Sequence, residues 1–245
     1  KMSKSKGNVV SPEDIIAKYG ADTARLFILF AAPPDRDLEW SDTGVEGCYR
    51  FLNRVWRLAN ELKDFVANHD GEEIVLKTKE DKQLNYMIHT TIKRVTEDIE
   101  ERFNFNTAIS AIMELVNEMY RYKELDSQSK NPGLLNKALE TLILLLAPFA
   151  PHIAEELWEM MGKQSSVHGE AWPAYDPKAV VKDEVEIVIQ IKGKVREKMY
   201  VSASLSEKEL QDAALSNEKI SSLIRGKEIV KCIAIHKKLV NIVVK

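Results

Sequence analysis

The spacing of the apolar residues changes once along this chain, and that change constrains the fold more than any other feature. From about residue 41 to residue 162 apolar residues recur every three or four positions, which is the period of amphipathic helices. In the string EVEIVIQI at residues 184–191 they alternate with polar residues, which is the period of a half-buried strand. The chain is therefore predicted to fold as a helical part followed by a smaller part that contains a sheet.

The helical part is predicted to be an antiparallel bundle because its segments are long, amphipathic and joined by polar turns. The helix that starts at Leu134 is apolar almost all round and is expected at the centre of the bundle. Trp56 and Trp158 are expected in the core, whereas Trp40 and Trp172 lie in connecting segments that they are expected to pin to the bundle. The predicted helices cover about residues 45–66, 80–101, 106–120 with Asn106 as the N-cap, 134–147 and 151–161.

The segments on either side of the bundle complete the predicted organisation. Residues 1–40 are expected to form a loop and two short helices, with Gly20 ending the first. Residues 41–165 are the bundle, residues 166–182 are a predicted linker rich in turn formers, and residues 183–245 are a small domain. In that domain a KGK turn joins two strands, two short helices follow, and the strands IVKCIAI and LVNIVV come last. The predicted fold class is mainly α: an antiparallel helical bundle followed by a small α/β C-terminal domain.

Composition narrows the classes of function. The formal net charge of −3 excludes a broadly basic surface for nucleic acid, so any such contact must come from local patches. The two cysteines, Cys48 and Cys232, lie far apart without a partner motif, and we expect reduced thiols in a cytoplasmic protein. The sequence shows no signal peptide, no run long enough to cross a bilayer and no zinc-ligand cluster. We expect a monomer that binds no metal, no DNA and no membrane.

The opening string KMSKSKG gathers cations, hydroxyls and a glycine in one short loop. Ammonium groups such as those of Lys1 and Lys4 can stabilise the charge that develops on a triphosphate as pyrophosphate leaves. The alternative is a solvated, lysine-rich segment, which is the usual meaning of such a charge pattern.

Two groups of cations further along the chain suit RNA phosphates. Arg50, Arg54 and Arg57 lie one helical turn apart on the first long helix, opposite its apolar face. The other group is in the basic tail, where residues 183–245 carry twelve Lys and Arg against nine Asp and Glu, a net charge of +3. For both groups an ordinary solvated polar face remains an alternative. The tail cations are Lys192, Lys194, Arg196 and Lys198 on the first hairpin, and Lys231, Lys237 and Lys238 near the second.

Several strings resemble a known family. KMSKS followed by KGNVVSPEDIIAKYGADTARLF resembles the signature loop and the stem-contact segment of class I aminoacyl-tRNA synthetases. LAPFAPHIAEELW is similar to a helix in the tRNA-binding bundle of the valine, isoleucine, leucine and methionine subgroup. PPDRDLEWSDTGVEGCYRFLNRVWRL and the tail strings VIQIKGKVREKMYV and KLVNIVVK are most similar to the bacterial-type leucine enzymes. The resemblance spans essentially the whole chain.

This resemblance implies a function and a set of site residues. Lys1 and Lys4 match the catalytic cations, and Lys1, Met2, Ser3, Lys4 and Ser5 match the ATP-binding loop. The implied reaction joins leucine to tRNA(Leu) with ATP and Mg²⁺ in the full-length enzyme. The bundle is expected to follow the tRNA backbone and the tail to contact the outer corner of the tRNA. The chain has no His-x-Gly-His string and no nucleotide-binding fold, so we expect a C-terminal portion that is inactive alone and holds no cofactor.

Two alternatives stay open. The first is the same region of a valyl- or isoleucyl-tRNA synthetase, against which the string DLEWSD and the short tail domain argue. The second is a non-catalytic tRNA-binding module, which would have no chemical reason to keep the complete KMSKS string. Charging assays would decide the first alternative, and the upstream reading frame would decide the second.

Overall fold

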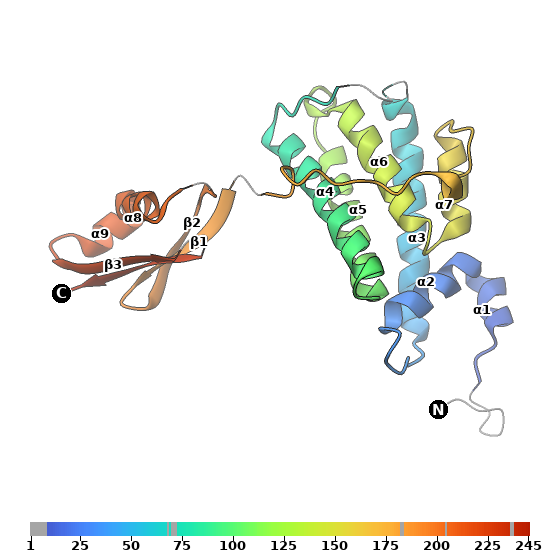
Figure 1. Ribbon diagram of the computed structural model, residues 1–245, viewed down its shortest axis with the longest axis horizontal. Coiled ribbons are helices and arrows are strands. Elements are labelled where there is room, and N and C mark those ends of the chain that lie inside the picture. The colour runs from blue at the N-terminus through green and yellow to red at the C-terminus, as the bar shows by residue number, and fades with distance from the viewer. Residues whose placement is uncertain (1–8, 68, 70–72, 182–183, 204, 236–237) are drawn as a thin grey trace. The chain divides into compact units, whose positions relative to one another are not determined.

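The computed structural model describes residues 9–67, 69, 73–181, 184–203, 205–235 and 238–245. It divides into two compact units, the first up to Val180 and the second from Val181. Nine α-helices and four strands lie within the described residues, and Figure 1 labels most of them. The predicted fold class, a mainly helical bundle followed by a small domain with a mixed sheet, is confirmed.

The first unit begins with two short helices, α1 (Pro12–Tyr19) and α2 (Ala21–Ala31). Proline at the first position and acidic side chains in the first turn favour the start of α1. Gly20 separates the two helices with a φ of 86°, a backbone conformation that side chains other than glycine rarely adopt. The predicted stop at this glycine is confirmed.

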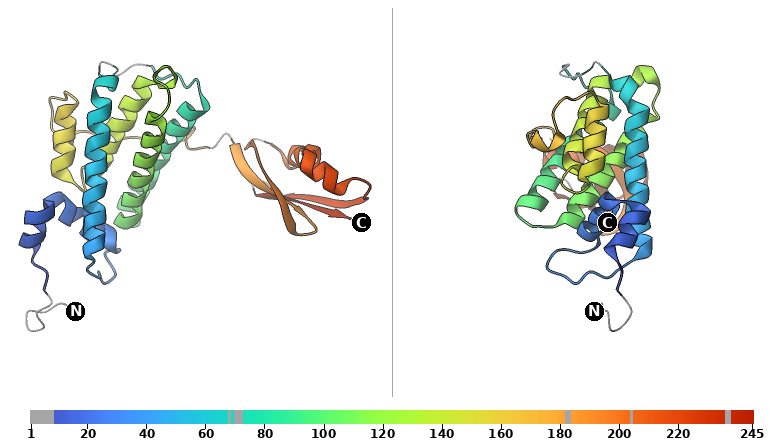
Figure 2. Two further views of the ribbon diagram at one scale, coloured as in Figure 1. Left: turned by 180° about the vertical axis from the view of Figure 1, so that it is seen from behind. Right: turned by 90° about the vertical axis from the view of Figure 1, so that its right-hand side faces the viewer.

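The bundle consists of five further helices that lie side by side (Figure 2). Side-chain caps fix where several of them begin: Ser41 accepts from the backbone of Gly44, and Thr78 forms a capping box with Asp81. The predicted Asn106 cap is wrong by two residues, because the chain reverses at Phe103 with a φ of 51° and Asn104 is the N-cap. The helices are α3 (Asp42–Val66), α4 (Lys79–Glu100), α5 (Phe105–Lys123), α6 (Pro132–Leu146) and α7 (Pro151–Met160), with short 3₁₀ turns η2 (Ser127–Ser129) and η3 (Val167–Gly169).

The bundle core confirms one tryptophan prediction and corrects another. Most of α6 is buried, and Trp158 on α7 is 5% exposed, as predicted. Trp56 is 40% exposed and therefore is not a core residue. Phe51 and Leu58 are buried as well, so the buried arc of α3 is centred further round the helix and Trp56 falls at its edge.

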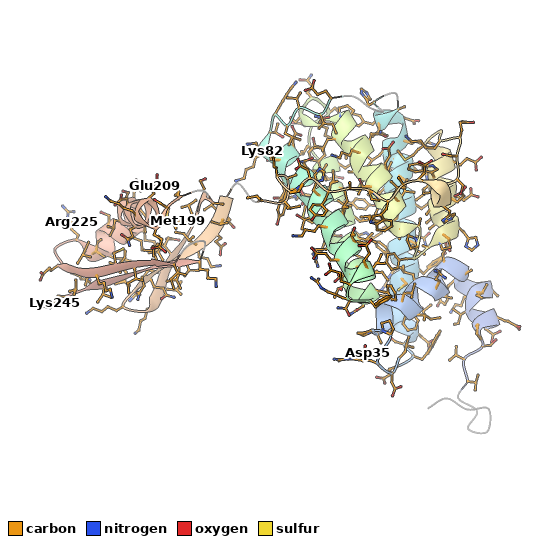
Figure 3. All side chains as sticks on the ribbon, viewed as in Figure 1. Asp35, Lys82, Met199, Glu209, Arg225 and Lys245 are labelled. Carbon is orange, nitrogen blue, oxygen red and sulfur yellow. The ribbon has the colours of Figure 1, made fainter. Side chains whose placement is uncertain are left out.

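The second unit is a four-stranded sheet with two helices. The strand order is β2-β1-β4-β3, with β1 and β4 parallel and the other pairs antiparallel. Both helices lie over one face of the sheet (Figure 1), and Met199, labelled in Figure 3, packs against the core between the two layers. The elements are β1 (Glu184–Ile191), β2 (Lys194–Ser202), α8 (Glu207–Ser216), α9 (Glu218–Ile224), β3 (Ile229–Ile235) and β4 (Leu239–Val244).

The predicted tight turn between the first two strands is confirmed. Lys192 and Gly193 have φ values of 50° and 74°, so both central residues are in the left-handed region that two-residue hairpin turns require. In the described part of the chain, every helix is too short or too polar to span a membrane.

Candidate nucleic-acid interface

The predicted ATP-binding residues Lys1, Met2, Ser3, Lys4 and Ser5 lie outside the described residues, so their roles stay predictions. The first described elements after them are α1 and α2, which lie at one end of the bundle (Figure 1). What holds these two helices in place therefore determines where the loop begins.

Helix α2 is bonded to the interruption between α6 and α7. Prolines at 148 and 151 interrupt the helical path there, which leaves backbone groups without helical partners. Arg25 donates from Nε and Nη2 to the carbonyl oxygen of Pro148, at 3.1 and 2.9 Å. One turn earlier, Asp22 accepts from the backbone N–H groups of His152 and Ile153, at 3.3 and 2.7 Å. Two side chains of α2 thus satisfy both ends of the interruption, an arrangement that we call the α2 clamp.

His152 lies in the first turn of α7. Its Nδ1 lies 2.8 Å from Oδ1 of Asp22, and its side chain is 77% exposed. The ring therefore adds a third contact to Asp22. Among the described residues, no group of three or more His, Cys, Asp or Glu side chains is placed to hold a metal ion, and His152 is therefore not part of such a group.

The three arginines of α3 do not act alike. Arg54 donates to Oδ1 of Asn117 at 2.9 Å and lies 5.1 Å from the ring centroid of Tyr120, whose hydroxyl donates to the Arg54 carbonyl. It therefore joins α3 to α5. Arg50 and Arg57 are exposed and make no ion pair or hydrogen bond with any described side chain, so they are free for an external anion.

The structure adds residues to this surface that the sequence analysis missed. Trp56 and Tyr49, at 40% and 42% exposure, are on the same side of α3 as the free arginines. A sequence signal was available: the strings YRFLN and WRLAN begin seven residues apart, which places them two turns apart on one face. We call this surface the α3 face; it consists of Tyr49, Arg50, Asn53, Trp56, Arg57 and Asn60.

The segment expected as a linker is bonded to the bundle over much of its length. Trp172 donates from its indole N–H to Oγ1 of Thr96 at 2.8 Å, which confirms its predicted role in pinning the segment. Further on, the backbone N–H of Asp176 donates to Nδ1 of His89 at 3.0 Å. Burial, followed by the charge of Lys137, lowers the pKa of His89 to about 4, so the imidazole is neutral and can accept this bond.

Most of the predicted cations on the hairpin of the second unit are exposed and have no acidic partner among the described residues. Lys192, Lys194 and Arg196 are exposed and make no ion pair with any described residue. Lys198 differs, because its Nζ lies 2.7 Å from Oε1 of Glu186, and this hydrogen bond raises the pKa of Lys198. Among the other tail cations, Lys231 and Lys238 are exposed, and Lys237 lies outside the described residues.

The two cysteines are free thiols in the structure. Cys48 is a core residue of α3, and burial raises its pKa to about 11. Burial also raises the pKa of Cys232. Neither thiol is activated as a nucleophile, because the thiolate is disfavoured at both sites.

Comparison with known protein families assigns most of the chain to a family. A family model described as "Anticodon-binding domain of tRNA ligase" matches residues 81–211. The chain belongs to this family. A second model, described as "tRNA synthetases class I (I, L, M and V)", matches residues 1–41, so this anticodon-binding domain is that of a class I synthetase. The resemblance seen in the sequence is confirmed at this level.

Two solved structures are similar to this anticodon-binding domain. One is the agnB2 LeuRS of Agrobacterium radiobacter K84 in a ternary complex with tRNA and LeuAMS, at 32% identity over 100% of this chain and a TM-score of 0.85. The other is the methionyl-tRNA synthetase of Mycobacterium tuberculosis with methionyl-adenylate, at 21% identity over 65% of this chain and a TM-score of 0.53, which supports the fold alone. The chain spans 32% and 35% of the lengths of these two proteins.

Proposed function

We propose that this chain is the tRNA-binding part of a leucyl-tRNA synthetase, which joins leucine to tRNA(Leu) through a leucyl-adenylate. The observation that carries the proposal is the likeness to LeuRS over the whole chain, including the small sheet domain, at 32% identity. The proposed reaction takes place in the cytoplasm.

In this proposal the described residues bind and orient tRNA. Arg50 and Arg57 on α3, and Lys192, Lys194 and Arg196 on the hairpin, are free cations that can neutralise phosphates. Binding should then weaken steeply as salt rises, because each neutralised phosphate releases condensed counterions. Leucine codons vary too widely for one anticodon to be read, so backbone and shape contacts suit this surface better than base readout of an anticodon.

The loop lysines are the proposed catalytic part of this chain. ATP, with Mg²⁺, supplies the activated phosphate in such a reaction, and the ammonium groups of Lys1 and Lys4 would stabilise the departing diphosphate. In the full-length enzyme, Lys4→Ala should lower the rate of adenylate formation far more than it weakens leucine binding. Equal losses in both would contradict a catalytic role.

The proposed specificity is tested with the full-length protein. Charging is measured with leucine, valine and isoleucine and with the three corresponding tRNAs, and tRNA affinity is measured from low to moderate salt. We expect charging of tRNA(Leu) with leucine and an affinity that falls steeply with salt. Charging with valine or isoleucine in preference to leucine would overturn the leucine assignment, and tRNA binding without any charging would favour a binding module.

A further inference from the structure

His89 is a buried histidine with a polar neighbour at each of its two ring nitrogens. It lies on α4 and is 5% exposed. Its Nδ1 accepts from the backbone N–H of Asp176 at 3.0 Å, and its Nε2 lies 3.0 Å from Nζ of Lys137 on α6. Both contacts have the length of a hydrogen bond. A ring turned by half a revolution would place carbon atoms at both positions, so the two contacts together fix its orientation.

The contact at Nδ1 determines which atoms of this pair carry protons. A backbone N–H can only donate, so Nδ1 carries no proton, and the single proton of the neutral imidazole is on Nε2. Nε2 therefore donates toward Lys137, whose nitrogen must be the acceptor. A lysine ammonium group has three donors and no acceptor, whereas a neutral amine has a lone pair. The geometry is satisfied only when Lys137 is a neutral amine.

The surroundings of Lys137 also favour the uncharged form. Burial lowers the pKa of Lys137, and the charge of Asp176 opposes this with a smaller effect. Oδ1 of Asp176 already accepts from the backbone N–H of Lys178 at 2.8 Å. A protonated Lys137 would face the Nε2 proton of His89, and its charge is the second cause, after burial, that lowers the pKa of His89. The two side chains therefore resist being protonated together.

Other charged side chains on the two helices are engaged elsewhere. Lys93 on α4 lies 3.8 Å from Glu97, and Glu140 on α6 lies 2.5 Å from Nζ of Lys163. Among the described residues, no carboxylate forms an ion pair with Lys137. Lys137 therefore lacks the partner that usually keeps a partly buried lysine charged.

We propose that Lys137 is a neutral, nucleophilic amine that is modified by small acyl phosphates. A free amine attacks a carbonyl carbon with its lone pair, which an ammonium group does not have. The new bond joins Nζ to the carbonyl carbon, and the bond from that carbon to the phosphate oxygen breaks, so that phosphate leaves with the electron pair. One amine proton passes to the phosphate. Acetyl phosphate, for example, would give acetyl-lysine and hydrogen phosphate.

An acyl group suits this place better than other small electrophiles. The amide product is uncharged, so it brings no new charge into a partly buried site. Its carbonyl oxygen can accept from Nε2 of His89, which restores the hydrogen bond that Lys137 leaves during the attack. Carbon dioxide would instead give a carbamate, a second negative charge close to Asp176. This inference goes beyond the proposed function and does not depend on tRNA binding.

The experiment measures acetylation rates of individual lysines in the full-length protein, with acetyl phosphate as the probe and peptide mass spectrometry as the readout. Between about pH 7 and 9, an ordinary lysine should react about tenfold faster per pH unit, because its amine fraction rises tenfold. Lys194, which is exposed and has no acidic partner among the described residues, is the internal control. Lys137 should react at a rate that hardly changes over this range. Limited access lowers the rate of a partly buried amine at every pH, so the shape of the profile is the test. A profile at Lys137 as steep as that at Lys194 would overturn the proposal.

Two substitutions at Asp176 test the hydrogen bond that sets the tautomer. Both remove the carboxylate, but only Asp176→Pro also removes the backbone N–H. Asp176→Ala should keep the flat profile at Lys137. Asp176→Pro should give a steep one, because Nδ1 of His89 can then carry the proton and Nε2 can accept from a charged lysine. His89→Gln offers an amide oxygen to a charged lysine and should also give a steep profile, which keeps the test open if the proline variant does not fold. Flat profiles in His89→Gln and in a folded Asp176→Pro would overturn the role given to His89.

The tautomer itself gives an independent readout. In the full-length protein labelled with ¹⁵N-histidine, the ring signals of His89, assigned with His89→Gln, should show a protonated Nε2 and an unprotonated Nδ1 at neutral pH. A proton on Nδ1 would overturn the inference. Because tRNA is absent from all of these measurements, their failure leaves the proposed function standing, and a failure of tRNA charging leaves this inference standing.

Discussion

The helical bundle and the small sheet domain present their cations in different ways. Residues 1–182 carry 23 Lys and Arg against 29 Asp and Glu, a net charge of −6, whereas residues 183–245 carry a net charge of +3. In the bundle many cations are paired internally, as in Arg94 with Glu114 at 2.7 Å and Arg121 with Glu118 at 2.6 Å. On the hairpin of the sheet domain, three neighbouring cations have no acidic partner among the described residues. In the proposed function, this difference would give two modes of RNA contact: a few contacts at defined positions on the bundle and general attraction of phosphates to the sheet domain.

The largest expected effect concerns the polar interior of the bundle. His89 is 5% exposed and its pKa lies near 4, below the value of about 6.5 in an unfolded chain. As pH falls from about 6.5 to about 4 the unfolded state binds a proton first, so the bundle should lose up to about 3 kcal/mol of stability. Above about pH 6.5 this contribution is constant. Urea unfolding followed by tryptophan fluorescence measures the bundle alone, because all four tryptophans precede residue 181. A His89→Gln variant should show a flatter pH dependence, and an equally steep one would disprove the assignment.

The second-largest effect is expected from the cations of the hairpin between β1 and β2. Replacing Lys192, Lys194 and Arg196 together with alanine should weaken tRNA binding about 100-fold at low salt and lower the salt slope by about 2 to 3. The matched control is Lys198→Ala, whose cation is already paired with Glu186 and should matter much less. Similar losses in the triple variant and in the control would mean that the hairpin does not contact phosphates.

A smaller effect is expected from the α2 clamp. Asp22→Ala removes the acceptor of two backbone N–H groups at the start of α7 and should lower the free energy of unfolding of the bundle by about 2 kcal/mol. Asp35→Ala is the control, because Asp35 is exposed and has no bonded partner among the described residues (Figure 3). Urea unfolding measures both variants. If the two variants unfold alike, the clamp contributes nothing to stability.

The smallest effect separates two arginines of one helix. Arg54→Ala should lower bundle stability by about 1 kcal/mol, because it loses the bond to Asn117, and should leave the salt dependence of tRNA binding unchanged. Arg57→Ala should leave bundle stability unchanged and should lower the salt dependence of tRNA binding. Thermal unfolding and the salt titration are measured on both variants. A stability loss in Arg57→Ala, or a lower salt dependence in Arg54→Ala, would contradict the assignment.

Local patterns predicted the fold well because each one acts over a few residues. The change of apolar period placed the helices and strands, and the turn at Gly193 and the stop at Gly20 follow from glycine's access to positive φ. The error at Trp56 arose because the width of a buried arc depends on how many neighbours pack around the helix. Phe51 and Leu58 are buried by neighbouring helices, and the sequence of α3 alone does not show where those neighbours lie.

The candidate site was less predictable because its defining bonds join distant residues. Arg25 and Pro148 are 123 positions apart, and Trp172 and Thr96 are 76 apart. No periodicity signals such pairs, and none could show that Arg54 is used internally while Arg57 is free. The roles of Lys1 and Lys4 rest on the resemblance of their string and stay predictions.

The α2 clamp also has a consequence for the order of folding. Helices α4 and α5 are neighbours along the chain and can pair as soon as both have left the ribosome, because only a short loop must close. Asp22 must wait for Ile153, 131 positions later, before its acceptor oxygens find their partners. During synthesis α2 can pack against α3 early, but the clamp closes only late, and a nascent chain that stops before residue 153 should leave the Asp22 carboxylate without its backbone partners.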